Sequence, residues 1–155
     1  MDFESQRLTE RLASTGFDPL RPAFISWLGV SMYLTMAAIA ETCAALGTLT
    51  AGTELVVDHI LPRRSLERAD RRFVDAITPW VAASGEPWRS HLGAEDISAV
   101  LRRNGFGAIR HIRQRDMIAA ALWRRADALR PMGISVVTHA TLGDPATRLA
   151  ELLTP

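Results

Sequence analysis

The 155-residue sequence carries a formal net charge of +1, with 48% hydrophobic and 23% charged residues. This balance fits one domain with its own core, and it excludes a disordered chain or a strongly basic nucleic-acid binder. The single cysteine, Cys43, excludes an internal disulfide. Together with a start, "MDFESQRLTE", that lacks the order of a secretory signal, it predicts a cytoplasmic protein.

The first third of the chain predicts a helix, a strand and a second helix. Asp2 is a suitable N-cap, and Gly16 a suitable C-terminal stop, for a helix over residues 2–16. The β-branched and aromatic run "AFISWLGV" predicts a short buried strand that ends at Gly29. Thr35 is a fair N-cap for the segment "TMAAIAETCAAL", whose apolar residues follow helical spacing.

The remaining segments continue to alternate. "ELVVDHIL" predicts a strand, residues 65–80 a helix with arginines on its wet side, and "AASGEPWRSHLG" a loop. "AEDISAVLRRNGF" predicts a capped helix that ends at Gly105, and "GAIRHIRQ" and "GISVVTHATL" predict strands around the partly helical "RDMIAAALWRRADALRPM". "DPATRLAELLTP" predicts a short helix or a frayed tail. This order favours an α/β domain with a largely parallel sheet.

Residues 22–40 contain no charged side chain, which is long enough for a membrane span. Ser26, Ser31 and Thr35 make the run only modestly hydrophobic, and Glu41 follows at once. We therefore favour a strand, a loop and a helix over a span. If helices cover both faces of that strand, its lack of charge is explained.

Common catalytic motifs are missing from the sequence. It has no G-x-x-x-x-G-K loop, no G-x-S-x-G elbow and no H-E-x-x-H, and its four histidines lack metal-ligand spacing, so we expect no metal site. In an open α/β sheet, ligands bind beyond the carboxyl ends of the strands. This rule selects residues 28–33 after the first strand, and Asp58 and His59 after the second.

Each candidate also has a plain structural interpretation. Asp58 and His59 form either an acid–base pair or a solvated strand end, and as neighbours on a strand they point to opposite faces. Tyr33 either reaches into a site or caps the core with its hydroxyl in water. Glu86 and Trp88 lie in a loop that either closes over a substrate or packs its tryptophan.

Several segments together resemble the later part of leucine carboxyl methyltransferase-like proteins, which are bacterial methyltransferases dependent on S-adenosylmethionine. They are "DFESQRL", "FDPLRPAFISWLGVSMYLT", "GTELVVDHILP", "GEPWRSHLGAEDISAVLRRNGF" and "RRADALRPMG". The resemblance implies a class I methyltransferase fold, a Rossmann-like sheet of strand order 3-2-1-4-5-7-6 with strand 7 antiparallel. Residues 1–155 then form a single partial domain that starts at the end of strand 3 and supplies strands 4, 5, 6 and 7 with their flanking helices.

The same resemblance assigns residues to the cofactor, S-adenosylmethionine. Asp2 and Phe3 match the family's "D-[LF]" after strand 3, where the aspartate is expected to bind the adenine amino group. Leu28 stands where many relatives carry a glutamate, before the glycine that matches Gly29. The glycine-rich turn after strand 1 and the acidic residue after strand 2 have no counterpart. We therefore expect weak or no cofactor binding by this chain alone.

The implied activity is O-methylation of a small molecule or of a carboxylate, truncated and weak or absent in this chain by itself. A hydroxyl acceptor would benefit from a base, and Asp58, His59 and Tyr33 are the candidates. Tyr33, Glu86 and Trp88 are candidates for substrate contacts. The alternatives are a non-enzymatic binding module or one subunit of a split methyltransferase. Strand 4 would leave an exposed edge, which predicts a homo-oligomer or a completing partner chain, with no nucleic acid or membrane as partner.

Overall fold

A computed structural model describes residues 2–124, 126–127 and 129–143. Its strands are β1 (Phe24–Trp27), β2 (Glu54–Ile60), β3 (Phe106–Arg113) and β4 (Ser135–Leu142). They form one sheet in the order β1-β2-β4-β3, in which β1 and β2 are parallel and β4 is antiparallel to both neighbours. This is the predicted order 4-5-7-6 with an antiparallel strand 7, so the fold prediction is confirmed.

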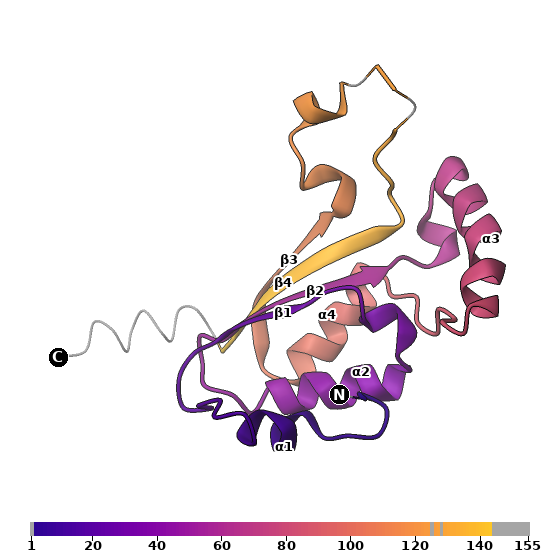
Figure 1. Ribbon diagram of the computed structural model, residues 1–155. Helices are drawn as coiled ribbons and strands as arrows, with labels where there is room; N and C mark the ends of the chain where they lie inside the picture. Colours follow the sequence, from indigo (N-terminus) through magenta and orange to yellow (C-terminus); the bar gives the residue numbers. More distant parts are fainter. Residues whose placement is uncertain (1, 125, 128, 144–155) are drawn as a thin grey trace.

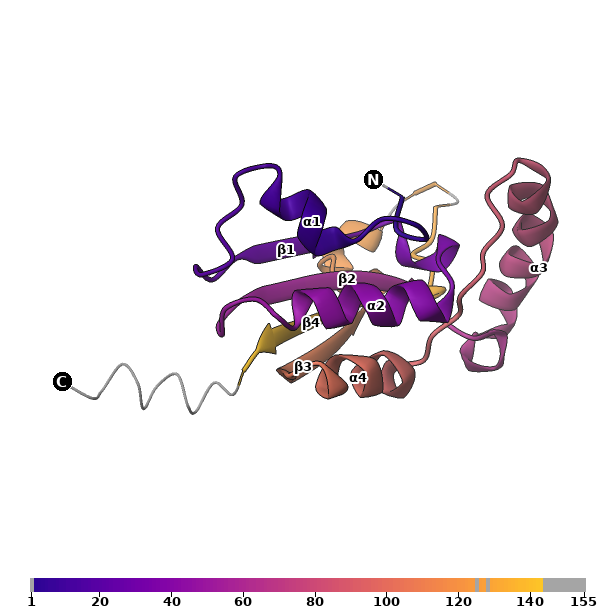
Figure 2. The ribbon, with the colours of Figure 1, turned by 90° about the horizontal axis from the view of Figure 1, so that it is seen from below.

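Four α-helices accompany the sheet in the described residues: α1 (Leu8–Ala13), α2 (Met36–Leu46), α3 (Arg68–Ala83) and α4 (Ala94–Arg103). Figures 1 and 2 show α1, α2 and α4 on one face, while α3 stands beyond the carboxyl end of β2. The opposite face carries no described α-helix, and the 3₁₀ turns within residues 114–123 rise on that side at the end of β3 (Figure 1). Cover on both faces, as the sequence suggested, is therefore wrong for the described chain. We call the two sides the covered face and the open face.

The core lies between the covered face and its three helices. The strands contribute residues that alternate along the chain, such as Leu55, Val57 and Ala140, all with no exposed surface. Helix α2 contributes Ile39 and Cys43, also fully buried. Burial raises the pKa of the Cys43 thiol to about 12, because the thiolate would lose its hydration.

Helix α2 begins as the sequence predicted. The Thr35 hydroxyl oxygen accepts a hydrogen bond from the Ala38 amide at 3.2 Å, which is N-cap geometry. The helix predicted over residues 2–16 is shorter, however. Asp2 caps a turn instead, accepting from the Glu4 amide at 2.9 Å and the Ser5 hydroxyl at 2.6 Å, and α1 starts only at Leu8.

Two later helical predictions also change. The helix expected over residues 65–80 spans Arg68–Ala83, because residues 63–65 form a 3₁₀ turn. In the described residues between β3 and β4, the helical elements are the 3₁₀ turns Gln114–Asp116 and Ala120–Trp123. The final "DPATRLAELLTP" begins at residue 144 and lies outside the described residues.

Strand β3 contains a bulge that sets which side chains face the core. Gly107 pairs with Thr141, but the next pair is Arg110 with His139, so β3 has one residue more than β4 across this step. Ala108 lies within the bulge at a φ of 45°, a left-handed conformation that non-glycine residues rarely adopt.

Candidate functional site

The candidate site is the edge of the sheet where β1 and β2 end. After Trp27 the chain turns at Gly29, which has a φ of +72° and therefore a conformation that favours glycine. The Gly29 amide donates to Asp58 Oδ1 at 2.8 Å, and the Ser31 hydroxyl donates to the Asp58 carbonyl. The ends of β1 and β2, which are strands 4 and 5 of the predicted order, are thus joined directly through Asp58.

Two further segments cover this edge. The backbone carbonyl of Met32 accepts from the Arg89 and Ser90 amides at 2.7 and 3.2 Å, so the loop that follows α3 is fixed to the turn after β1. From the other side, the Glu4 carboxylate accepts from the Thr35 amide at 2.8 Å and contacts the Arg89 guanidinium at 3.3 Å. The Glu4 side chain therefore ties the N-terminal segment, the start of α2 and the loop together.

Phe3 stacks on Trp27, with ring centroids 5.9 Å apart and an interplanar angle of 26°. Trp27 is 5% exposed, and its indole Nε1–H has no hydrogen-bond partner in the described part of the chain. A buried donor without a partner is costly, and such groups in native proteins require an explanation. The Trp123 indole N–H is a second buried donor without a partner in the described residues.

The other cofactor candidates, Asp2 and Leu28, are sequence neighbours of Phe3 and Trp27, and both are exposed. Asp2 is exposed, and its hydrogen bond with the Ser5 hydroxyl, followed by that with the Glu4 amide, holds the pKa of the carboxyl below its ordinary value. Leu28 is 50% exposed just before the Gly29 turn. The aspartate is thus charged and accessible to a donor such as an amino group.

Asp58 and His59 point to opposite faces of β2. Asp58 is half-buried on the open side, whereas His59 is 1% exposed under α4. His59 Nδ1 donates to the Leu92 carbonyl at 2.8 Å, since that oxygen can only accept. Its Nε2 then accepts from the Thr138 hydroxyl at 3.0 Å. Both ring nitrogens are occupied on the core side, so His59 does not reach the site edge.

The chain of hydrogen bonds continues beyond His59. Because the Thr138 hydroxyl donates to His59, it accepts from His111 Nδ1 at 2.9 Å, and His111 Nε2 accepts from the Ser98 hydroxyl at 2.9 Å. Burial lowers the pKa of both His59 and His111. This network joins α4 to β2, β3 and β4 in one neutral state, and sequence reasoning missed it because its members are far apart in the chain.

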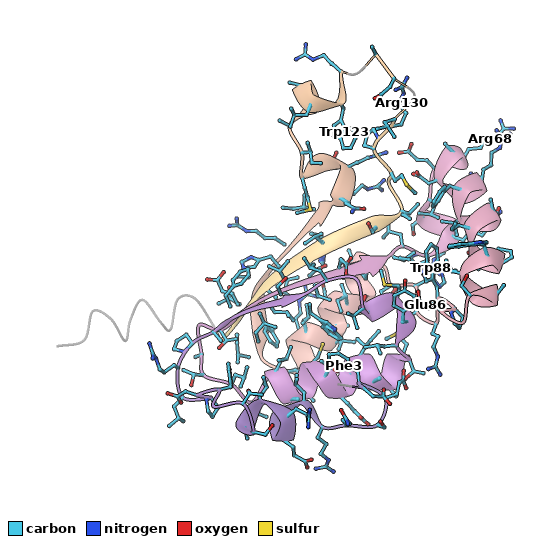
Figure 3. The ribbon with its side chains drawn as sticks, viewed as in Figure 1. Phe3, Arg68, Glu86, Trp88, Trp123 and Arg130 are labelled. Atoms are coloured by element: carbon cyan, nitrogen blue, oxygen red, sulfur yellow. The ribbon has the colours of Figure 1, made fainter. Side chains whose placement is uncertain are left out.

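The substrate candidates are spread over a wider region. Tyr33 is half-buried in the 3₁₀ turn Ser31–Tyr33 beside the site edge. Figure 3 shows Glu86 and Trp88 toward α3, apart from Phe3, which lies beside α2. Trp88 packs on a small cluster of Leu61, Leu66, Val74 and Val136, and Glu86 is exposed.

The described residues also form a groove of about 590 Å³ between the N-terminal segment and α2. It shares Phe3 and Glu4 with the site edge but contains neither Gly29 nor Asp58. Among the described residues, no cluster of histidine, cysteine and acidic side chains could hold a metal ion, and no helix is long and apolar enough to cross a membrane.

Comparisons with known proteins bear on the family and on the fold. Residues 1–47 match the family model of leucine carboxyl methyltransferase. The chain has the fold of class I methyltransferases. The predicted resemblance is thereby confirmed, and the matched residues include Phe3, Trp27 and Gly29 of the site edge.

Similar solved structures support the fold at low sequence identity. A DUF574 family protein from Streptomyces avermitilis is 15% identical, with a TM-score of 0.64 over 93% of this chain and 53% of that chain. A SAM-dependent methyltransferase from Archaeoglobus fulgidus is 11% identical, with a TM-score of 0.55 over 91% of this chain and 65% of that chain. A third, the carbon methyltransferase CurJ, is 20% identical, with a TM-score of 0.53 over 93% of this chain and 34% of that chain.

The chain therefore spans about half the length of the first structures that it matches, 49% and 53%. No curated protein matches the sequence.

Proposed function

We propose that this chain is the acceptor-side half of an S-adenosylmethionine-dependent methyltransferase, acting on a hydroxyl or a carboxylate. The observation that carries the proposal is the site edge itself. A methyltransferase sheet places there a stacked Phe3–Trp27 pair, an unpartnered buried indole N–H and a Gly29 turn held by Asp58. In α/β sheets of this kind ligands bind at the carboxyl ends of the strands.

The residues present fit one side of a cofactor cradle. Asp2 would accept from the adenine amino group, Phe3 would contact the adenine ring, and the Trp27 N–H and the Gly29 turn would lie beside the remaining polar groups. The cofactor supplies a sulfonium methyl group that is transferred by in-line displacement. The described chain contributes no glycine-rich turn to hold the opposite side, so we expect this chain alone to bind weakly.

The chain's own contribution to catalysis is alignment and, for a hydroxyl acceptor, proton removal. A carboxylate acceptor needs no base. For a hydroxyl acceptor, Asp58 is the candidate base, because it is half-buried at the site edge while His59 is engaged in the core. Tyr33 is the candidate for orienting the acceptor, since its turn is fixed by the Arg89 and Ser90 amides.

The buried, unpaired Cys43 accords with a reducing cytoplasm.

The proposal is tested with the indole N–H signals of the four tryptophans in a ¹⁵N-labelled chain. We expect S-adenosylmethionine at millimolar concentration to shift the Trp27 signal and to leave Trp80 and Trp123 unchanged. A Phe3→Ala variant, which removes the stacked ring, is expected to abolish the shift. No movement of Trp27, or movement of Trp80 or Trp123 alone, contradicts the proposed site. Micromolar affinity in calorimetric titration contradicts weak binding by this chain alone.

One observation favours a second candidate, a part of a two-chain enzyme or a binding module. Among the described strands, β1 pairs only with β2, and its four residues carry no charge or proline to discourage pairing at the other edge. A partner strand at this edge would extend the sheet. Titration with a chain that carries a glycine-rich strand–helix unit distinguishes the two, because only a split enzyme would then bind S-adenosylmethionine tightly.

A further inference from the structure

The open face of the sheet carries an apolar stripe that crosses all four strands. The strand pairings place Phe24, Val56, Val137 and Ile112 on this face, in successive strands from β1 to β3. Phe24 and Ile112 are 68% and 45% exposed, and the two valines are half-buried. Large apolar side chains gathered in one exposed band are typical of a surface that contacts another protein element.

Polar side chains border this stripe. On β2, Glu54 and Asp58 lie on either side of Val56 along the strand and face the same way. Glu54 contacts His139 Nε2 at 2.8 Å. A partner for the open face therefore needs a narrow apolar strip flanked by basic side chains, which describes an amphipathic helix better than a second sheet.

Helix α3 of the chain itself has such a strip. Ala69, Phe73, Ala76 and Trp80 follow helical spacing, and all four are exposed, Phe73 by 42% and Trp80 by 65%. The opposite side of α3 is anchored by Val74, which is buried in the cluster that includes Leu61, Leu66 and Val136. The helix thus remains attached to its own chain while it presents a second apolar side outward.

The flanking charges of α3 complement the open face. Arg72 lies beside the outer strip and Arg68 one turn before it, both exposed, and Figure 3 shows Arg68 directed away from the sheet. Arg72 on the helix thus corresponds to Glu54 on β2, while Asp58 stays with the Gly29 amide. The lengths also agree: the strip from Ala69 to Trp80 spans about 17 Å along α3, and the stripe, which runs diagonally across the four strands, spans about 20 Å.

We propose that two copies of the chain associate by placing α3 of each on the open sheet face of the other. Such an exchange is isologous, so it closes as a dimer. In each copy it covers the apolar strip of α3 and the apolar stripe of the sheet. In this dimer the face that the described chain leaves bare is covered by a helix, as is usual for sheets with parallel strands. The contact is separate from the free edge of β1.

The experiment is sedimentation velocity of the 155-residue chain from about 1 to 200 μM, a range suited to a modest interface. We expect a monomer–dimer equilibrium, and Trp80→Ser is expected to raise the dimer dissociation constant by at least about tenfold. Arg72→Glu and Glu54→Arg are each expected to weaken the dimer, and the double variant to recover much of the loss. Circular dichroism establishes that each variant is folded.

Two exposed leucines serve as matched controls. Leu122 and Leu20 are 65% and 82% exposed but lie outside both strips, so Leu122→Ser and Leu20→Ser should leave the dimer unchanged. A monomer over the whole concentration range overturns the proposal. A dimer that is lost in Leu20→Ser and intact in Trp80→Ser assigns the contact to the β1 region and also overturns it. Failure of the charge exchange to recover affinity counts against the pairing of Arg72 with Glu54.

Discussion

The two faces of one sheet use the same four strands in different ways. On the covered face, Leu55, Val57 and Thr138 have no exposed surface, and the Thr138 hydroxyl has hydrogen-bond partners in His59 and His111. On the open face, the adjacent residues Val56 and His139 are only half-buried. Stability is therefore concentrated on one side, and the other side is free to contact a ligand or a partner.

The largest expected difference between the faces is in apolar truncation. Leu55→Ala on the covered face is expected to lower the free energy of unfolding by about 2–5 kcal/mol, because it leaves a cavity in the core. Phe24→Ala removes a larger side chain on the open face, yet in the monomer we expect a loss under about 1 kcal/mol, because that ring is mostly in water there. Urea denaturation with unchanged m-values, at concentrations below the dimer dissociation constant, measures both. Equal losses would show that the open face is packed within the monomer.

A smaller difference in the free energy of unfolding is expected between substitutions at two polar neighbours on β4, Thr138 and His139. Thr138→Val keeps the shape but removes the hydroxyl that links His59 and His111, leaving two ring nitrogens without partners. We expect a loss of about 2 kcal/mol. His139→Gln, which disturbs only the half-exposed contact with Glu54, is expected to cost under about 0.5 kcal/mol. The same urea experiment decides, and a near-neutral Thr138→Val would contradict the assigned network.

The smallest expected effect is a pH dependence that arises from the covered face. Burial lowers the pKa of His59 in the folded chain, so below its ordinary pKa, about 6.5, the unfolded chain binds a proton that the folded chain does not. Stability is therefore fully present above pH 6.5 and falls as the pH decreases below it, by up to about 1.4 kcal/mol per pH unit. Unfolding midpoints at pH 5.5 and 7.5 measure this. His139→Gln should retain the dependence, whereas a flat profile in the parent chain excludes it.

The sequence predicted the positions of strands and helices better than the contacts that their side chains make. The β-branched runs located β1 and β2, and Thr35 located the start of α2, because both signals are local. The helix predicted from Asp2 does not start there. The Asp2 carboxylate accepts hydrogen bonds from the Glu4 amide and the Ser5 hydroxyl in a turn, and this turn competes with helix formation.

The site was only partly readable from the sequence. Strand periodicity correctly placed Asp58 and His59 on opposite faces. It could not show that His59 is engaged by Thr138, 79 residues away, or that Glu4 joins Thr35 to Arg89. Such contacts depend on how distant segments meet in space, for which one sequence holds no local signal.

The bulge in β3 shifts the alternation of its side chains between the two faces of the sheet. The extra residue at Gly107–Arg110 lets Phe106 and His111 face the same side, although an odd number of positions separates them. Deletion of the codon for Ala108 would remove the bulge and pair Ile109 with Ala140, so Arg110 and His111 would keep their faces. Deletion of a residue after the bulge, such as Arg110, would instead turn the following side chains to the other face. Among natural relatives, single-residue gaps should therefore be found at Ala108 more often than in the rest of β3.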